Sequence, residues 1–386
     1  MRESTGMIPY ARQWVDDDDR RAVQAVLQGD WLTTGPAVER FEAALCEATG
    51  AGYAVAVNSG TAALHAAYAA VGVGPGGEVV TTPLTFLATA NAAVYLGARV
   101  RFADICGATG LIDPGAVDRL VGPSTQAIVA VDYAGHPADY GALREIAVAH
   151  KVALVADAAH SLGAARGNEW VGTMADVSCL SFHPVKPITT GEGGAVLTDD
   201  PEIAARARRF RNHGVTRDPA RWVGGDEGPW NYEMHELGHN YRLTDLQAAL
   251  GTSQLKKLGL FVARRAEIAA RYRAELAGVD ELCLPVVEPG VRPGWHLFVV
   301  RIRGDGGRRR ALFERLHELG LGVQVHYRPV CDQPYYRRQQ GETASCPVAR
   351  HFYERAISLP LFPAMEDREV EAVIEGVRQA VGEVLR

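Results

Sequence analysis

The sequence predicts an α/β protein with a large domain on a mostly parallel β-sheet and a smaller α+β domain after it. Between about residues 50 and 198, short apolar runs alternate with Ala-rich or amphipathic stretches. This alternation is typical of a sheet covered by helices on both faces. After about residue 255 long charged helical stretches dominate, and 386 residues suffice for two domains. We therefore place the large domain at 1–255 and the small one at 256–386.

The elements of the large domain follow from these apolar runs. Predicted strands are Tyr53–Val57, Glu78–Thr82, Ala127–Val131, Val152–Ala156, Val177–Ser181 and Gly194–Leu197. Predicted helices between them are Thr61–Val71, Thr85–Leu96 and Asp139–His150. A further helix should run from Thr244 to about Leu258, with Thr244-Asp245 as its cap. The stretch Thr216–Trp230, rich in Gly, Asp and Pro, predicts a mobile loop.

The small domain is expected to begin with a long charged helix and to end with another helix. Its predicted elements are the helix Phe261–Ala277, the strand Trp295–Ile302, the helix Arg308–Leu319, the strand Gly322–His326 and a helix from Asp367.

Composition excludes several classes of protein. The chain is 47% hydrophobic and 22% charged with a formal net charge of -6, and no Lys- or Arg-rich run indicates a nucleic-acid surface. Its six cysteines form no CxxC pair, which favours free thiols in a reducing compartment. Met1–Tyr10 lacks the apolar core of a signal peptide, and no run of about 18 apolar residues predicts a membrane span. The cytoplasm is the expected location.

A possible phosphate site lies where the first predicted strand ends. Asn58-Ser59-Gly60-Thr61-Ala62 forms a turn of small residues before an Ala-rich helix. The first N–H groups of a helix are unpaired and carry partial positive charge, so they can hold a phosphate. An ordinary helix cap is the simpler alternative. Phe86, in Pro83-Leu84-Thr85-Phe86, would be a functional residue only if its ring stacks on a flat cofactor nearby.

An acid closes the fourth predicted strand, in Asp157-Ala158-Ala159-His160. Ligands of open α/β sheets lie beyond the carboxyl ends of the strands. A carboxylate there could keep a pyridine nitrogen protonated, and His160 could contact the same ring. A helix cap at Asp157 and an ordinary polar contact at His160 remain alternatives.

The decisive segment runs from Ser181 to Gly194 and contains Lys186 among Pro, Val and Ile. A lysine forms an imine with an aldehyde cofactor only when burial or neighbours lower its pKa. Ser181 could bind a phosphate, and the glycines before Gly194 allow a strand to pass close to a ligand. A surface lysine would be the better interpretation of Lys186 alone. The order of phosphate turn, stacking ring, acid and lysine on one sheet favours the cofactor site.

Motifs along nearly the whole chain resemble the DegT/DnrJ/EryC1/StrS family of sugar aminotransferases. The matching segments include Leu32–Pro36, Ser59–Leu64, Asp157–His160, Ser181–Gly194, Arg211–Gly214, Leu237–Arg242, His326–Val330 and Leu359–Leu361. The resemblance implies the type I fold of enzymes that use pyridoxal phosphate (PLP) and its amino form PMP.

The resemblance also implies roles for single residues. Lys186 would form the Schiff base with PLP, and Asp157 would pair with the pyridine nitrogen. His160, where many relatives have Gln, would lie beside the ring on which Phe86 stacks. The phosphate would bind the set Gly60, Thr61, Ala62 and Ser181. Asn240 would reach the phosphate of a neighbouring subunit, which implies a homodimer with shared active sites.

Within the family, the segment from Phe182 to Gly194 and the segments Ile8–Tyr10 and Gln333–Tyr336 look most like the pseudaminic-acid branch. That branch aminates C4 of a UDP-linked 2-acetamido-2,6-dideoxy-4-keto sugar with L-glutamate as donor. The implied contacts to the sugar nucleotide are Tyr10, Trp31, Leu32, Thr33, His326 and Tyr327. The alternative substrate is a dTDP-linked keto-deoxysugar aminated at C3 or C4.

Three rival functions have arguments against them. His235-Glu236-Leu237-Gly238-His239 spells a zinc-protease motif, but it contains Gly238 and precedes the predicted helix start at Thr244, so we expect no metal. Sugar dehydratases of this family resemble the rest with histidine in place of the lysine, unlike Lys186. A non-catalytic regulator would need a DNA-binding module, for which the chain has no basic segment.

Overall fold

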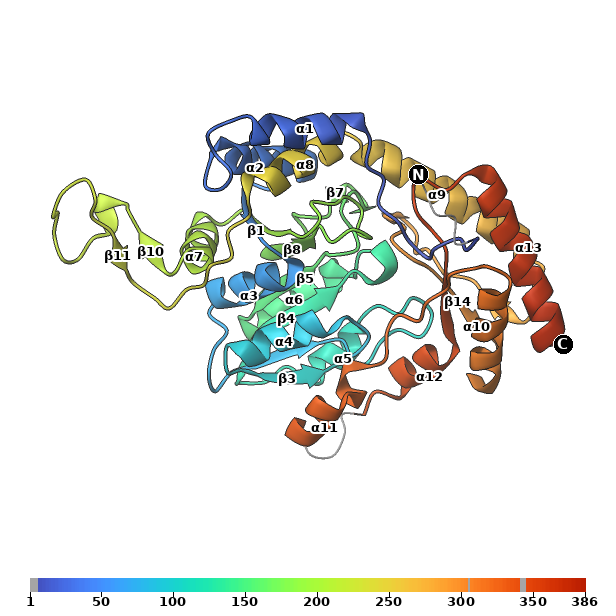
Figure 1. Cartoon of the computed structure of the whole chain (residues 1–386). Helices are drawn as coiled ribbons and strands as arrows, with labels where there is room; N and C mark the ends of the chain where they lie inside the picture. The colour runs from blue at the N-terminus through green and yellow to red at the C-terminus, as the bar shows by residue number, and fades with distance from the viewer. Residues whose placement is uncertain (1–5, 305, 341–344) are drawn as a thin grey trace.

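The computed structural model describes residues 6–304, 306–340 and 345–386, and its centre is a seven-stranded sheet (Figure 1). The strand order is β1-β9-β8-β5-β4-β2-β3. Only β9 runs against the direction of the other six, so the predicted mostly parallel sheet is confirmed. The bounds are β1 Tyr53–Val57, β2 Glu78–Thr81, β3 Arg99–Phe102, β4 Thr125–Val131, β5 Ala153–Asp157, β8 Val177–Ser181 and β9 Gly194–Thr198.

Helices cover both faces of this sheet because successive strand side chains point to opposite sides. Val55 and Val155 belong to a core with α3 and α4, whereas Ala54 and Leu154 belong to a core with α2 and α6. The helices of this region are α1 Asp17–Leu27, α2 Pro36–Thr49, α3 Gly60–Ala70, α4 Leu87–Tyr95, α5 Pro114–Asp118, α6 Tyr140–His150, α7 Pro201–Arg211 and α8 Asp245–Leu255.

The C-terminal part packs a small antiparallel sheet, of order β12-β14-β15, against helices. Its core is a third cluster that includes Phe298, Leu316 and Val373. Its elements are α9 Leu258–Glu275, β12 Leu282–Cys283, β14 Phe298–Ile302, α10 Arg309–Glu318, α11 Pro334–Gln340, α12 Pro347–Arg355, β15 Ala356–Leu359 and α13 Asp367–Val384. The division at residue 255 stays a prediction, because Leu297 and Phe352 also pack into the core of the large sheet.

The predicted strand Gly322–His326 is wrong. The backbone of this segment divides its hydrogen bonds between two neighbours, so no continuous ladder forms. Gly322 N donates to Ile8 O at 2.7 Å, whereas Gln324 exchanges bonds with Ser358 at 3.1 and 2.7 Å. The segment therefore touches the edge of β15 at one residue and then continues as irregular chain toward His326.

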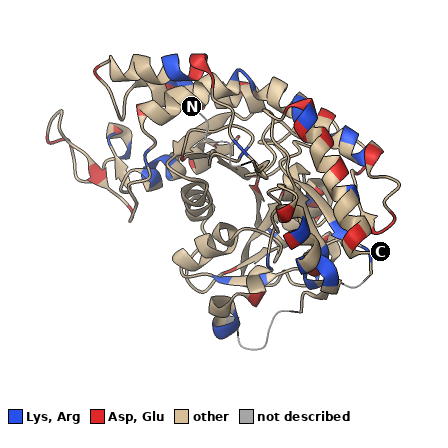
Figure 2. Cartoon of the chain, turned by 45° about the vertical axis from the view of Figure 1, so that its right-hand side comes forward, with Lys and Arg blue, Asp and Glu red and all other residues tan. Residues whose placement is uncertain are grey.

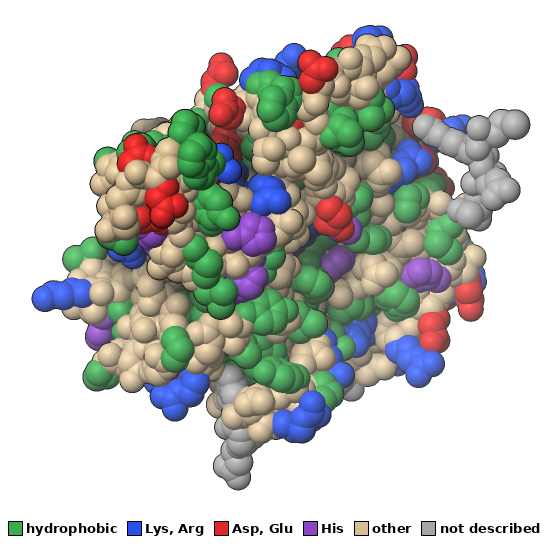
Figure 3. Space-filling view, turned by 60° about the vertical axis from the view of Figure 1, so that its left-hand side comes forward, with side chains coloured by type: hydrophobic (Ala, Val, Ile, Leu, Met, Phe, Trp, Pro, Cys, Tyr) green, Lys and Arg blue, Asp and Glu red, His purple; other side chains and the backbone are tan. Residues whose placement is uncertain are grey.

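A long arm projects from the body between α7 and α8, at the left of Figure 1. Its base is the pair β10 Val215–Thr216 and β11 Glu233–Met234, and the predicted loop lies between them. Five large hydrophobic side chains on or beside the arm are exposed: Val223, Trp230, Tyr232, Met234 and Leu237. On the face turned forward in Figure 3, hydrophobic and histidine side chains gather side by side.

The remaining short elements lie in connections. They are β6 Ala165–Arg166, β7 Glu169–Trp170, β13 Val291–Arg292 and the 3-10 turns Tyr133–Gly135, Pro219–Arg221, Gly306–Arg308 and Val330–Asp332. Acidic and basic residues alternate along the outer helices in Figure 2. No helix in the described ranges has the length and apolar character that crossing a membrane requires.

Candidate active site

Lys186 and Asp157 lie close enough, at the carboxyl end of the sheet, for each charge to influence the pKa of the other. Asp157 is the last residue of β5, and Lys186 lies in the loop between β8 and β9. Burial lowers the pKa of Lys186 to about 8, although the nearby Asp157 charge opposes that shift. Burial likewise raises the pKa of Asp157, against the hydrogen bond from Thr89 and the charge of Lys186. Desolvation therefore dominates at both groups and favours their neutral forms.

Asp157 is held in place by donors on both oxygens. Thr89 Oγ1 donates to its Oδ2 at 2.6 Å, and Ala159 N donates to its Oδ1 at 3.3 Å. Thr85 Oγ1 lies 2.7 Å from Thr89 Oγ1, which fixes the rotamer of Thr89. Thr89, on α4, was not predicted, because nothing in its sequence neighbourhood indicates that it meets the end of β5. The carboxylate therefore has a fixed orientation before any ligand binds.

The predicted phosphate turn forms the N-terminus of α3 beside the end of β8. Ser59 caps the helix, and its Oγ accepts from Ala62 N at 3.1 Å. Among the described residues, the amides of Gly60 and Thr61 therefore remain without an acceptor. A Cβ on Gly60 would lie 2.8 Å from Ser181 Cβ and 3.0 Å from its Oγ. Two free amides and one hydroxyl thus converge where an anion can bind.

His160 and Tyr327 join two segments of the predicted site. Tyr327 Oη lies 3.2 Å from His160 Nε2, and the rings are nearly parallel with centroids 6.1 Å apart. His160 is buried, and its Nδ1 has no partner among the described residues. Burial, and next the charge of Lys186, lower the pKa of His160 well below its usual value. His160 is therefore a neutral imidazole with one ring nitrogen free for a ligand.

His326 and Tyr10 continue this wall. His326 Nδ1 lies 2.8 Å from Ser358 Oγ, and the Tyr10 ring lies 5.6 Å from the His326 ring. Burial, and next Lys186, lower the pKa of His326 to about 4. The structure thus brings Tyr10, His326, Tyr327 and His160 together, and the charge of Lys186 reaches both histidines.

Phe86 is an aromatic side chain that remains exposed next to the site. It is the N-cap residue of α4, 58% exposed, with its ring 6.2 Å from Tyr327. An exposed aromatic ring beside a partly buried tyrosine offers a flat apolar surface to a planar ligand.

His296 is a site neighbour that sequence reasoning missed. It is buried, its ring lies 4.3 Å from the His160 ring, and its Nδ1 has no partner in the described chain. Burial, followed by His160 and Lys186, lowers the pKa of His296 well below its usual value. Its sequence context, Gly-Trp-His-Leu in a predicted strand, carries no sign of this contact.

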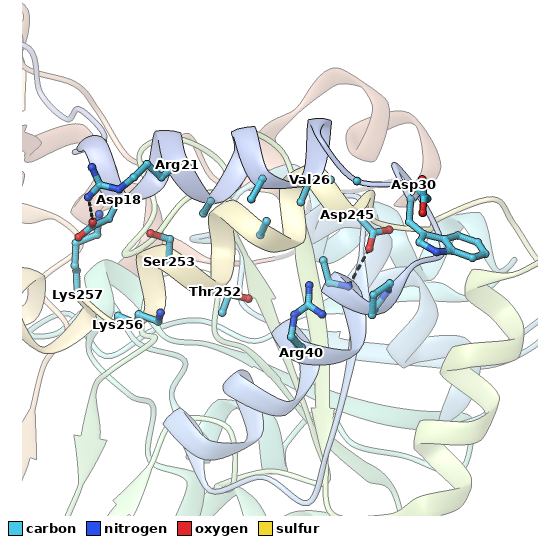
Figure 4. Close-up of a pocket in the computed structure, with 17 residues that line it drawn as sticks. Asp18, Arg21, Val26, Asp30, Arg40, Asp245, Thr252, Ser253, Lys256 and Lys257 are labelled. Atoms are coloured by element: carbon cyan, nitrogen blue, oxygen red, sulfur yellow. Dashed lines mark hydrogen bonds and ion pairs between the residues drawn. The ribbon is translucent and has the colours of Figure 1, made fainter.

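Trp31, Leu32 and Thr33 lie on the loop between α1 and α2. Trp31 is 58% and Leu32 51% exposed, and Thr33 pairs with Thr244 in a one-residue bridge. Figure 4 shows the groove of about 680 Å³ between α1, α2 and α8 that Trp31 helps to line. No contact of the described residues links these three side chains to Lys186, so their role stays a prediction.

Asn240 lies just after the arm and is exposed. Its carbonyl accepts from Asn58 Nδ2 at 3.4 Å, and it bridges Asn212. The contact of its side chain with a second subunit stays a prediction. The neighbouring zinc-protease motif is not helical: His235 pairs with Glu233 at 2.7 Å, and His239 stacks on Tyr241. The two histidines therefore do not share a helix face.

These residues fit pyridoxal phosphate. A buried acid suits a pyridinium, an amine with a lowered pKa suits an aldehyde, and the α3 amides with Ser181 suit a phosphate. The unpaired Nδ1 of buried His160 provides one further contact for a ring substituent.

Comparison with known proteins agrees with this geometry. Residues 13–378 match the model of the DegT/DnrJ/EryC1/StrS aminotransferase family. The spore coat polysaccharide biosynthesis protein SpsC of Bacillus subtilis is 39% identical over 97% of each chain. Helicobacter pylori PseC, an aminotransferase of pseudaminic acid biosynthesis, superposes with a TM-score of 0.91 at 33% identity, covering 98% of this chain and 100% of PseC.

A third relative bears on the cofactor. The putative sugar aminotransferase Spr1654 of Streptococcus pneumoniae, solved in its PLP-form, superposes with a TM-score of 0.91 at 27% identity, covering 98% of this chain and 100% of Spr1654. With the family model matching most of the chain, the chain belongs to the DegT/DnrJ/EryC1/StrS aminotransferase family and is a sugar aminotransferase that depends on pyridoxal phosphate.

Proposed function

We propose that the protein transfers the amino group of L-glutamate to C4 of a UDP-linked 2-acetamido-2,6-dideoxy-4-keto hexose. The observation that carries the transfer is that Lys186, with its lowered pKa, lies within electrostatic reach of Asp157, whose carboxylate is held by Thr89. The choice of sugar rests on the likeness to PseC and on the Tyr10, His326 and Tyr327 wall.

Each side chain has a separate task in this proposal. Bound PLP supplies an electron-accepting ring that stabilises the carbanion at the reacting carbon. Asp157 keeps the pyridine nitrogen protonated, and Thr89 keeps Asp157 aligned with it. Gly60, Thr61 and Ser181 hold the phosphate, with Asn240 of a second subunit. Ala62 contributes through the capped start of α3, since its own amide is engaged by Ser59.

Lys186 has two tasks. It would hold the cofactor, and as a free amine it would act as the base that moves a proton at the reacting carbon. A lysine with a pKa of about 8 is partly neutral near physiological pH, so it can accept that proton. The neutral imidazoles of His160 and His326 add no positive charge beside it.

The assignment of the lysine is tested by Lys186→Ala. We expect this variant to lose transaminase turnover because both the attachment point and the base are removed, while its circular dichroism and its size in solution stay those of the wild type. Substantial remaining turnover would contradict the proposed role of Lys186.

The sugar is tested separately with the wild-type enzyme. PLP, L-glutamate and a panel of UDP- and dTDP-linked 4-keto and 3-keto sugars are incubated with it, and the products are identified by mass spectrometry. Amination of the UDP-linked 4-keto sugar is the expected result. Amination of dTDP-sugars alone would show that the pseudaminic branch is the wrong assignment.

A further inference from the structure

One buried carboxylate, Asp245, anchors the exposed loop that joins α1 to α2. We propose that Asp245 is a positioning residue that holds Trp31, Leu32 and Thr33 in place for the nucleotide sugar. This inference rests on the proposed function, because the sugar contacts of that loop belong to it. Asp245 acts through the backbone of the loop and has no contact with the substrate itself.

Asp245 uses both of its oxygens where the loop enters α2, at the cap residue Gly35 and in the first turn of the helix. Its Oδ2 accepts from Gly35 N at 2.8 Å, and its Oδ1 accepts from Ala37 N at 2.9 Å. Its own backbone N donates to Leu32 O at 3.0 Å. The side chain is 1% exposed, so these bonds are shielded from water and from salt. In Figure 4, Asp245 extends from the start of α8 toward the start of α2.

The helix α8 does not need Asp245 as its cap. The sequence predicted Thr244-Asp245 as the cap, and the structure assigns this to Thr244, whose side chain accepts from Gln247 N. In return, Thr244 N donates to the side-chain oxygen of Gln247, which completes a capping box. The Asp245 carboxylate is therefore free to serve the loop of another segment.

The loop has little else to fix its shape. Trp31 and Leu32 are more than half exposed, so no core packing holds their side chains. Thr34 has a φ of 55°, and a Cβ on Gly35 would lie 2.4 Å from Trp31 Cβ and 2.7 Å from Asp245 Oδ1. Such a tight turn keeps one conformation only while its amides have fixed acceptors.

The same turn of α8 also supports the lysine loop. Gln247 Nε2 donates to Glu192 O at 2.7 Å, within the segment that follows Lys186. A Cβ on Gly251, one turn further along α8, would lie 2.9 Å from Thr190 Cγ2, so the helix lies directly on that segment. The start of α8 thus fixes the substrate loop relative to the lysine loop.

Asp245→Asn and Gly35→Ala each disturb the hydrogen bond between Asp245 and Gly35, one at the acceptor and the other at the donor residue. The first variant places an amide where the carboxylate was, so N–H groups would face one of the two backbone donors. The methyl group that the second variant adds would push Trp31 away from Asp245. Each variant should raise KM for the keto sugar about tenfold or more, the expected effect of losing a charge-assisted hydrogen bond. The glutamate half-reaction, followed by cofactor absorbance without sugar, should stay within about twofold of wild type, because the contacts expected of this loop are with the sugar nucleotide.

Asp104→Asn is the matched control. Asp104 also accepts two amides at a helix start, from Val348 at 2.9 Å and Ala349 at 2.9 Å, but those belong to α12. It should lower the melting temperature without the rise in KM for the sugar. Calorimetric binding of UDP-N-acetylglucosamine, which has no keto group, gives a readout independent of turnover. We expect weaker binding by Asp245→Asn and Gly35→Ala and wild-type binding by Asp104→Asn.

Two results would overturn the inference. One is wild-type KM and wild-type UDP-N-acetylglucosamine affinity in both Asp245→Asn and Gly35→Ala. The other is an equal slowing of the glutamate half-reaction, which would make Asp245 a general structural residue. Failure of the proposed function looks different, because the wild type itself would then aminate no UDP-linked keto sugar.

Discussion

Lys186 differs from a lysine in water in two ways. Its amine is partly neutral near pH 7, and the acid near it, Asp157, is itself desolvated. Burial shifts the pKa of Lys186 downward and that of Asp157 upward. The same desolvation lowers the pKa values of His160 and His296. Burial thus favours the neutral forms of the ionisable side chains around Lys186, and a bound phosphate cofactor would bring its own charge to the site.

A pH dependence follows at the scale of this residue. Only the neutral amine attacks an aldehyde, so incorporation of PLP into the apoenzyme should accelerate about tenfold per pH unit below the Lys186 pKa of about 8 and level off above it. Stopped-flow absorbance between pH 6 and 9.5 measures this. An exposed lysine, with a pKa of about 10.4, would show a rate still rising at the top of that range.

At the scale of elements, the phosphate turn depends on how closely β9 passes the start of α3. A Cβ on Gly194 would lie 2.5 Å from Ser59 O and 2.8 Å from Gly60 N. This close approach places the free amides of α3 next to Ser181 at the end of β8. Gly194 pairs with both β1 and β8, and its closeness to Ser59 and Gly60 leaves no room for a side chain.

Gly194→Ala should therefore weaken cofactor binding. The added methyl group forces the α3 turn away from Ser181, and we expect the PLP dissociation constant to rise about tenfold or more. Titration of apoenzyme with PLP measures it. Gly382→Ala is the control, because no atom lies within 4 Å of a Cβ there in α13; it should stabilise the fold by about 0.5–1 kcal/mol and leave PLP affinity unchanged. Unchanged affinity in Gly194→Ala would contradict this account.

At the scale of the whole molecule, the arm and its exposed hydrophobic residues bear on assembly. Trp230 and Leu237 are exposed, and Asn240 follows directly on the arm. The face in Figure 3 on which hydrophobic and histidine side chains gather is the kind of surface that a second copy would cover. We propose a homodimer in which each Asn240 serves the partner's phosphate site.

Subunit complementation tests this arrangement. Lys186→Ala and Asn240→Ala chains should each be impaired as homodimers, but a heterodimer would contain one site with both native residues. Equal mixing by unfolding and refolding should therefore restore about a quarter of wild-type activity, since half the dimers are mixed and each has one intact site. Activity no higher than the average of the two homodimers would show that Asn240 acts within its own subunit.

The sequence alone predicted most of the large sheet and the candidate residues at its carboxyl edge. Apolar runs bounded by turn residues predicted six of the seven strands of the large sheet. They missed β3, Arg99–Phe102, because alternating arginines interrupt its apolar pattern at the sheet edge. The helices α1, α2 and α7 also went unpredicted, although caps such as Asp16 and Asp200 mark their starts.

Only the tertiary structure decided which side chains support the site. Asp157 and the α3 turn could be predicted because one closes a strand and the other opens a helix, and parallel strands end at one edge. Lys186 could be predicted because it lies in the loop that follows the end of β8 at the same edge. Thr89, His296 and Asp245 could not, because each acts through a partner that is far away in sequence: Asp157, His160 and Gly35. The prediction of a strand at Gly322–His326 was wrong for the same reason, because Ile8 and Ser358, both far away in sequence, bind different residues of this segment. Local pattern determines the elements, whereas contacts between distant segments determine how they are held.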